Sequence, residues 1–228
     1  MAAAHVFVAD LAAPELAAGD RHHLERVLRL RAGEEVTASD GAGRWVTCRW
    51  GGGAAPGLSV DGPVVVEAAP SVLVAVAFAP VKGDRPEWAV QKLTELGVDR
   101  IVPLVAARSV VRWTGERAAG PLERWRRVAR EAAMQSRRVW LPVVEEPVGF
   151  EEAAGWPGAA LAVAGGDPPS LARPTVLVGP EGGWDPDELA AGLPTVGLGP
   201  NVLRTETAAV AAATLLVALR SGLLAPHR

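Results

Sequence analysis

The sequence predicts an α/β protein in which a parallel sheet with crossover helices follows a small β domain. Beyond about residue 70, short apolar runs alternate with segments of helical periodicity, which is the pattern of a parallel sheet. Before that point the chain has short strand-like runs separated by turn signals. We therefore expect two domains, residues 1–69 and 70–228, with a boundary near Pro70 and Ser71.

The first domain is predicted to be a small β domain with one helix. Residues 44–50 alternate loosely between apolar and polar types, and Asp40-Gly41 is a turn signal between two strand-like segments. Residues 22–30 are predicted to be helical, because four apolar residues are spaced for one side of a helix: Leu24, Val27, Leu28 and Leu30.

The second domain is predicted to alternate strands with helices. A helix over residues 86–96 has Pro86 in its first turn and Gly97 as its C-terminal stop. Further helices are expected over residues 116–134, with arginines on the side away from the apolar stripe, and 208–219. The apolar and β-branched runs predict strands over residues 72–79, 101–105, 139–144, 159–164, 175–178 and 195–198.

Composition narrows the class of protein. The chain has 228 residues, 49% hydrophobic and 21% charged, which is typical of a globular protein with a real core. The single cysteine, Cys48, excludes an internal disulfide and favours a cytoplasmic location. The histidines and this cysteine never fall at a metal-ligating spacing. The start of the chain lacks the features of a signal peptide, and no apolar run is long enough to span a membrane.

The net charge of −3 conceals an uneven distribution. Residues 100–138 contain ten arginines and only three glutamates. The arginines are Arg100, Arg108, Arg112, Arg117, Arg124, Arg126, Arg127, Arg130, Arg137 and Arg138, and the glutamates are Glu116, Glu123 and Glu131. A second basic set comprises Arg21, His22, His23, Arg26, Arg29 and Arg31. Such basic surfaces can hold a phosphate backbone whatever the overall charge, so an RNA partner stays possible.

Two glycine-rich loops, residues 177–184 and 199–207, each follow a short apolar strand and precede a helix. Strand, glycine turn and helix bring backbone N–H groups to a ligand at the carboxyl end of a strand, so the two loops predict two walls of one pocket. Thr205 suits the N-cap of the final helix, and Glu206 and Thr207 suit its first turn. Arg204 is unexplained by helix capping, because a cation opposes the dipole at a helix N-terminus.

These loops carry a resemblance to a known family. LVGPEGGW over residues 177–184 and LGPNVLRTETAAVAA over residues 198–212 resemble the C-terminal signature of the RsmE family. Residues 82–98 (KGDR, then Glu87 and QKLTELGV), Arg108-Ser109-Val110 and residues 22–29 resemble further blocks of that family, in the same order along nearly the whole chain. Members are SPOUT-class methyltransferases that modify N3 of a uridine in small-subunit (16S) ribosomal RNA.

The resemblance implies several features that periodicity does not reveal. It implies a SPOUT domain with a deep trefoil knot, a PUA-like RNA-binding β-barrel over residues 1–69, S-adenosylmethionine as cofactor and a homodimer. It also implies that the two loops and residues 165–167 wrap the cofactor. No GxGxxG fingerprint is present, which disfavours an ordinary Rossmann methyltransferase.

The resemblance and the residue chemistry together nominate the site. Arg204 is expected to stabilise the developing anion on the uracil, and Glu206 to orient Arg204 or accept the proton, or else to be an ordinary first-turn carboxylate. The cofactor is expected to contact Leu177, Gly179, Glu181, Gly182, Gly183, Leu198, Gly199, Asn201, Leu203 and Thr205, although each leucine has a core role as its alternative. Trp184 is a candidate lid or stacking surface, whereas the other tryptophans are expected in the core. Predicted RNA contacts are His22, His23, Arg26, Arg29, Lys82, Arg85, Lys92, Arg108 and Arg138, with solvated charge as their alternative. For Lys82, Arg85 and Lys92, contact with the partner subunit is a further alternative.

The chain departs from the family pattern at residues 134–137, Met-Gln-Ser-Arg, where an acid and a glycine are usual, and at Asn201 and Trp184. Two other functions stay open on the sequence alone. One is a SPOUT methyltransferase that acts on another RNA, and the other is a non-catalytic RNA-binding or ribosome-assembly factor. The intact Arg204-Thr205-Glu206-Thr207 run favours the enzyme.

Overall fold

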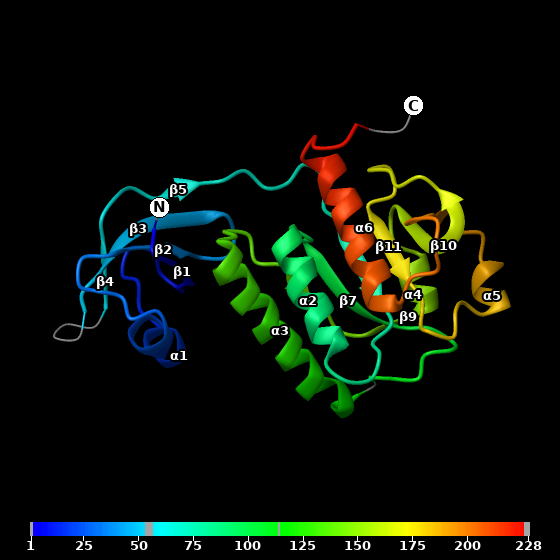
Figure 1. The fold of residues 1–228 in the computed structure, drawn as a ribbon, viewed down its shortest axis with the longest axis horizontal. Coiled ribbons are helices and arrows are strands. Elements are labelled where there is room, and N and C mark those ends of the chain that lie inside the picture. Colours follow the sequence, from blue (N-terminus) through cyan, green and yellow to red (C-terminus); the bar gives the residue numbers. More distant parts are fainter. Residues whose placement is uncertain (1, 53–56, 114, 226–228) are drawn as a thin grey trace. The chain divides into compact units, whose positions relative to one another are not determined.

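The computed structural model describes residues 2–52, 57–113 and 115–225. The chain forms two compact units, which are Met1–Pro70 with Arg130–Leu141, and Ser71–Ala129 with Pro142–Arg228. Figure 1 shows the elements of each unit. No helix within the described ranges is long and apolar enough to cross a membrane.

The first unit is built on a five-stranded sheet. Strands β1 (Ala4–Phe7), β2 (Glu35–Ser39), β3 (Arg44–Trp50) and β4 (Leu58–Val60) are neighbours in that order, and β5 (Val65–Val66) also pairs with β3. The predicted alternation of β3 is confirmed, because Val46, Cys48 and Trp50 are buried. The turn at Asp40-Gly41 is also confirmed. Gly41 has φ +76°, and the Asp40 carboxylate accepts from the backbone N–H groups of Ala42 and Arg44.

The predicted helix over residues 22–30 is wrong in its bounds and in its apolar side. Helix α1 (Ala18–His22) begins earlier and continues as a π-helical turn, η1 (His23–Val27). Leu24 is buried, but Val27 is 61% exposed. A π-turn winds an extra residue per turn, so side chains three and four apart no longer share one face.

The second unit contains a seven-stranded parallel sheet. Its order is β12 (Thr195–Val196), β10 (Ala159–Asp167), β11 (Thr175–Val178), β6 (Ala75–Phe78), β7 (Arg100–Val105) and β8 (Val143–Val144), and β9 (Val148–Gly149) also pairs with β7. The prediction of a parallel α/β sheet is confirmed. The strand expected over residues 139–144 is reduced to its last two residues, because Pro142 interrupts it and Val139 bonds within the first unit.

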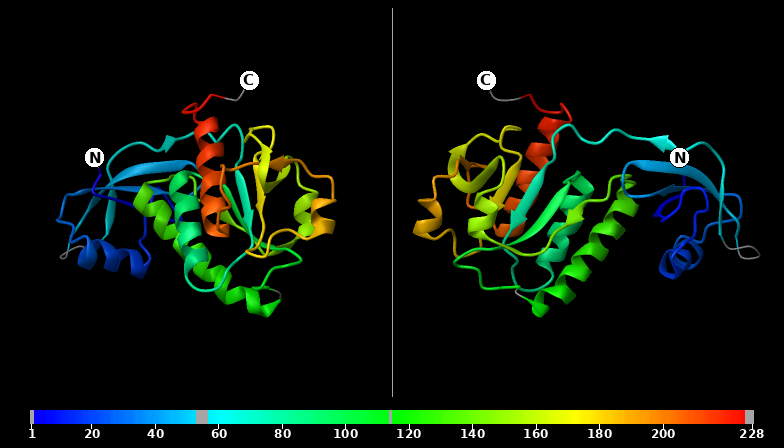
Figure 2. Two further views of the ribbon diagram at one scale, coloured as in Figure 1. Left: turned by 45° about the vertical axis from the view of Figure 1, so that its right-hand side comes forward. Right: turned by 180° about the vertical axis from the view of Figure 1, so that it is seen from behind.

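Helices cover both faces of this sheet (Figure 2). On one face, Val76 and Phe78 of β6 pack with residues of α2 (Arg85–Leu96), α3 (Glu116–Ser136) and α6 (Thr205–Arg220). On the other, Ala77 packs with Ala153 of α4 (Phe150–Ala154) and with Trp184. The short α5 (Pro186–Leu189) follows Trp184 in the chain. Alternate side chains of β6 therefore belong to two hydrophobic cores, one on each face of the sheet.

The helix predicted over residues 86–96 is confirmed as α2, and Gly97 ends it at φ +104°. The exposure of a tryptophan on this helix was not anticipated. Trp88 is 46% exposed, which contradicts the expectation that tryptophans outside the loop lie in the core. Trp50 and Trp125 meet that expectation.

Candidate functional site

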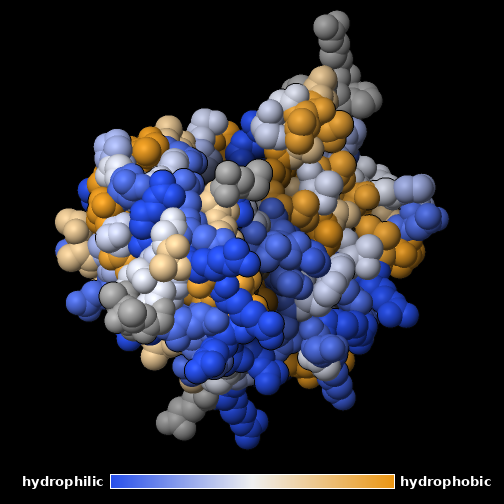
Figure 3. Space-filling model, turned by 60° about the vertical axis from the view of Figure 1, so that its left-hand side comes forward, coloured by the Kyte–Doolittle hydropathy of each residue, from blue (hydrophilic) through white to orange (hydrophobic). Residues whose placement is uncertain are grey.

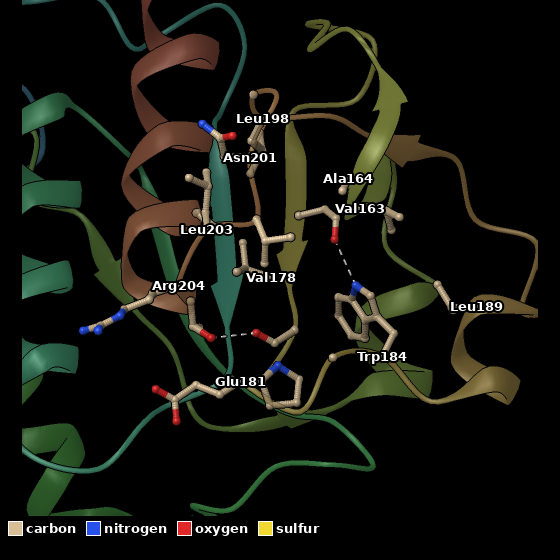
Figure 4. A pocket seen from close by; sticks show the side chains of 18 residues that line it. Val163, Ala164, Val178, Glu181, Trp184, Leu189, Leu198, Asn201, Leu203 and Arg204 are labelled. Carbon is tan, nitrogen blue, oxygen red and sulfur yellow. Dashed lines mark hydrogen bonds between the residues drawn. The ribbon is translucent and has the colours of Figure 1, made fainter.

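A cavity of about 610 Å³ lies in the second unit beside the carboxyl end of β11 (Figure 4). Its walls come from three segments, with Leu189 and Ala208 completing them. The three segments contribute Ala162, Val163 and Ala164; Val178, Gly179, Pro180, Glu181, Gly183 and Trp184; and Leu198, Gly199, Asn201, Val202, Leu203, Arg204 and Thr205. The two glycine-rich loops therefore line one cavity, as predicted. The segment in β10 was expected to contribute residues 165–167, but residues 162–164 line the cavity instead.

One hydrogen bond joins the two loops. The Thr205 hydroxyl donates to the carbonyl oxygen of Gly179 at 3.0 Å. Thr205 is not the N-cap that its residue type suggests. It is the first residue of α6, and Arg204 occupies the N-cap position with no side-chain capping bond.

Trp184 forms a fixed wall of the cavity. Its indole Nε1 donates to the carbonyl oxygen of Ala162 at 3.0 Å, and its ring meets Phe150 edge-on with centroids 5.7 Å apart. A Cβ at Gly179 would lie 3.0 Å from the Trp184 ring, so the ring occupies the space that a side chain there would need. Buried and bonded in this way, Trp184 is a wall and not the mobile lid or exposed stacking surface considered from sequence.

The loop before α5 is tied to the loop after β7. Asp185 and Glu188 form a capping box at the start of α5, and Glu188 also accepts a hydrogen bond from the backbone N–H of Ala107 at 2.8 Å. Arg108 donates to the carbonyl oxygen of Gly182 at 3.3 Å and pairs with Asp185 at 3.4 Å. These contacts hold the loop that follows β11 from its outer side.

Three charged side chains meet beside the cavity. Arg85 Nη1 lies 2.9 Å from Glu181 Oε1 and 3.4 Å from Glu206 Oε1. The hydrogen bond to Glu181, with smaller contributions from both carboxylates, raises the pKa of the Arg85 guanidinium, so it stays charged. The Glu181 carboxylate points away from Trp184 and out of the cavity (Figure 4), although Glu181 lines the cavity.

Arg204 stands at the rim. Its side chain is exposed and extends away from Trp184 (Figure 4), and it makes no hydrogen bond or ion pair with other residues that the structure describes. The expectation that Glu206 orients Arg204 is not met in this structure, because the carboxylate of Glu206 is bound to Arg85.

Comparison with known proteins identifies the family. A family model described as an RNA methyltransferase domain matches residues 68–217, and one described as an RNA methyltransferase PUA domain matches residues 16–49. The ribosomal RNA small subunit methyltransferase E of Mycobacterium bovis is 37% identical over 231 residues, which cover 89% of this chain and 86% of that protein. The chain belongs to the ribosomal RNA small subunit methyltransferase E family.

Solved structures of methyltransferases agree with this assignment. A probable rRNA-methyltransferase from Porphyromonas gingivalis has a TM-score of 0.80 and 27% identity, covering 97% of this chain and 100% of that one. The ribosomal RNA small subunit methyltransferase E of Neisseria gonorrhoeae, solved bound to S-adenosyl methionine, has a TM-score of 0.75 and 27% identity, covering 96% and 97%. Membership in the methyltransferase E family, the α/β fold and the PUA domain are thereby confirmed, while the trefoil knot stays a prediction.

Most of the nominated cofactor residues of this family member line the cavity. Eight of the ten do so: Gly179, Glu181, Gly183, Leu198, Gly199, Asn201, Leu203 and Thr205. Leu177 does not, because successive strand residues point to opposite faces. Its side chain lies in the core with Trp184, and Val178 lines the cavity in its place. Gly182 lies outside the cavity, against Arg108.

The nominated RNA contacts differ in their exposure and in whether they already have partners. His22, His23, Arg26 and Arg29 are exposed on the first unit, and Lys82 is exposed at the start of the KGDR block in the second. Others already have partners: Arg85 as described, Lys92 with Glu95 at 2.8 Å, and Arg108 with Asp185. Arg138 is half-buried. Several arginines of the basic stretch are likewise paired within their own unit, among them Arg100 with Glu145, Arg126 with Glu146 and Arg130 with Asp20.

Sequence reasoning missed part of the cavity. The apolar run of β10 was expected only as a strand, although Ala162, Val163 and Ala164 form one wall. Their small size is a usable signal, because a strand beside a bound ligand favours small side chains. Val202 was also missed, and it lines the cavity while being 92% exposed.

Proposed function

We propose that the chain transfers the methyl group of S-adenosylmethionine to N3 of a specific uridine in 16S ribosomal RNA, with the assembled small subunit as its substrate. The observation that carries this proposal is the cavity between the two signature loops, with Arg204 at its rim. Family membership and the S-adenosyl methionine bound to the Neisseria gonorrhoeae relative support the choice of cofactor and substrate.

The cavity suits the proposed cofactor. Its volume falls within the range of sites for small molecules, and its walls combine apolar side chains with main-chain groups of the glycine loops. Val178, Leu198 and Leu203 offer an apolar surface for a purine ring, whereas Gly199, where a Cβ would meet no atom within 4 Å, allows close approach to the backbone. Gly199 has φ +152°, a conformation that L side chains rarely adopt.

The bound cofactor would supply an electrophilic methyl group on a sulfonium. The residues of this chain would then orient the acceptor and handle its proton, because a protonated N3 is nearly unreactive. Arg204 would donate hydrogen bonds to the uracil carbonyl oxygens and would stabilise the negative charge that develops there. Glu206 is the proposed acceptor for the N3 proton. Its Oε2 is buried and has no hydrogen-bond partner among the described residues.

Recognition of the RNA would use both units. We propose residues 1–69 as an RNA-binding domain and residues 70–228 as the methyltransferase domain. The exposed His22, His23, Arg26 and Arg29 would contact phosphates from the first, and Lys82 from the second. Lys92, Arg108 and Arg138 are weaker candidates because they are paired or half-buried. Affinity should fall with rising salt concentration, since phosphate contacts release counterions.

We also propose a homodimer that acts in the cytoplasm. Half-buried apolar side chains run along α6, including Val210, Leu215 and Leu219, and Leu223 beyond its end is 81% exposed. Figure 3 shows apolar side chains, in orange, gathered on the upper right of the surface in that view. Such a surface is typical of an interface. Analytical ultracentrifugation at micromolar concentration should give twice the mass of the 23.7 kDa chain.

The role of Arg204 provides the test of the proposal. Arg204→Ala should lower methylation of small subunits by about 10²-fold or more, as loss of a charge-stabilising donor does. Calorimetric affinity for S-adenosylmethionine should change by less than about fivefold, because the guanidinium points out of the cavity. Arg44→Ala serves as the matched control, because Arg44 is exposed on β3 and outside the proposed site. A comparable loss of cofactor affinity in Arg204→Ala would mean that Arg204 has a structural role.

A further inference from the structure

We propose that Arg85 is a positioning residue for methyl transfer, which holds the Glu206 carboxylate in place while it fastens the cofactor loop to the start of α6. This inference rests on the proposed function. It also gives Arg85 a different role from the RNA contact expected of its motif. The geometry that points to it is the sharing of one guanidinium nitrogen between Glu181 and Glu206.

The three residues come from three separate elements. Arg85 begins α2, Glu181 lies in the loop after β11, and Glu206 is in the first turn of α6. Arg85 therefore links two segments that both line the cavity. The link runs parallel to the hydrogen bond from Thr205 to Gly179, so the loops are joined once by neutral groups and once by charges.

The two carboxylates differ in their surroundings. The Glu181 side chain is 51% exposed, so solvent screens its interaction with Arg85. The Glu206 side chain is only 9% exposed, and Arg85 is the cation at hydrogen-bond distance from it among the residues described. Without Arg85, this buried carboxylate would lack its counter-charge.

The second oxygen of Glu206 differs from the first in having no partner. Oε1 is taken by Arg85, whereas Oε2 is buried and has no hydrogen-bond partner in the described part of the chain. A buried carboxylate oxygen without a partner can still accept a hydrogen bond. The N3–H group of a uracil is such a donor.

In the proposed reaction, Oε2 of Glu206 accepts the proton that methyl transfer displaces from N3. As the bond from the methyl carbon to sulfur breaks and its bond to N3 forms, the N3–H proton moves to Oε2 of Glu206. Glu206 becomes a neutral acid and later returns the proton to solvent. Arg85 keeps its own proton throughout and acts only through Glu206.

Arg85 is poorly placed to hold an RNA phosphate. Its nitrogen already serves two carboxylates, so the three side chains together carry one net negative charge. A phosphate that approached Arg85 would meet this excess negative charge. The exposed Lys82, three residues earlier, makes no ion pair with other described residues and suits that role better.

The test compares Arg85→Met and Arg85→Lys with the wild-type protein on small ribosomal subunits. The turnover number at saturating substrates and the KM for small subunits are measured, together with the calorimetric Kd for S-adenosylmethionine. Arg173→Met is the matched control, because Arg173 forms a 2.9 Å ion pair with Asp167 outside the cavity.

We expect Arg85→Met to lower the turnover number by about 10- to 100-fold. Arg85→Lys should restore part of the turnover number, while Kd rises only severalfold. In the Glu206→Gln background, Arg85→Met should cause no further loss of turnover. A normal turnover number in Arg85→Met, with only KM or Kd increased, would overturn the positioning role. An inactive wild-type protein would instead overturn the proposed function itself.

Discussion

The hydroxyl of Thr205 lies 3.0 Å from the carbonyl oxygen of Gly179, so the first residue of α6 is bonded to the residue that follows β11. This contact joins the two loops that line the proposed cofactor cavity. It also explains why a threonine is present at a position where no helix cap is needed.

Replacing Thr205 by valine should therefore separate the loops while preserving the size of the side chain. We expect a loss of roughly 0.5–1.5 kcal/mol in the free energy of unfolding, the net worth of one hydrogen bond. The Kd for S-adenosylmethionine should rise by about 3- to 10-fold, because the cavity becomes less preorganised. Thr214→Val is the control, since its exposed hydroxyl bonds only within α6. Equal effects of the two variants on cofactor affinity would contradict this account.

The close approach of β10 and β12 leads to a second prediction. A Cβ at Gly166 would lie 2.7 Å from the carbonyl carbon of Val196. The nearest atoms belong to the backbone of Val196 and Gly197, which cannot move aside as a flexible side chain can. Gly166→Ala should therefore force the strands apart and cost about 1–3 kcal/mol in the free energy of unfolding. The shift should reach Leu198 at the cavity and weaken cofactor binding in a calorimetric titration.

Gly120→Ala is the opposite control for this glycine. Gly120 lies within α3, and a Cβ added there would meet no atom of a neighbouring element within 4 Å. Alanine there should raise the free energy of unfolding by about 0.5–1 kcal/mol, because glycine is a poor residue for a helix interior. If both substitutions destabilise the protein equally in urea, steric contact is not the cause.

The sequence anticipated the elements in which local signals agree. Helix α2 has Pro86 near its start and Gly97 at its end, and both are local markers. The pairing of Arg85 with Glu206 was out of reach, because the two residues are 121 positions apart and meet only when the sheet order is known. For the same reason the wall formed by Ala162 to Ala164 was not foreseen, since it depends on β10 lying between β11 and β12.

Buried His5 gives a prediction for pH. Burial, opposed by a hydrogen bond with the backbone of Arg138 and assisted by the charge of Arg137, lowers the pKa of His5 from 6.5 to about 4. The unfolded chain therefore takes up this proton at a higher pH than the folded protein. The contribution of neutral His5 to the free energy of unfolding is fully present above pH 6.5. It is lost as pH falls toward 4, and its loss amounts to roughly 3 kcal/mol at most.

Urea denaturation between pH 5 and 7 measures this dependence. The free energy of unfolding should decline toward pH 5 in the wild-type protein and in the exposed-site control His22→Gln. The decline should be flatter in His5→Gln, which keeps a polar group near Thr37 but does not titrate. An unchanged slope in His5→Gln would show that other groups are responsible.

The first unit depends on an ion pair near its N-terminal strand. Arg130 donates to both carboxylate oxygens of Asp20, at 2.9 and 2.6 Å, and to the carbonyl oxygen of Phe7 at 3.2 Å. Asp20 is buried, so Asp20→Ala should cost about 1.5–3 kcal/mol, as a hydrogen bond to a charged group does. Chemical denaturation measures the loss, and the substitution Arg127→Ala, at an exposed position of α3, should have little effect.

The most direct test of the proposed reaction is to incubate the protein with radiolabelled S-adenosylmethionine and small ribosomal subunits that lack the modification. The RNA is then digested and its nucleosides are separated. We predict that the label appears in 3-methyluridine and that Arg204→Ala abolishes it. Label in another nucleoside would contradict the proposed acceptor atom and substrate. The absence of both label and cofactor binding would contradict the enzymatic function and favour a non-catalytic RNA-binding protein.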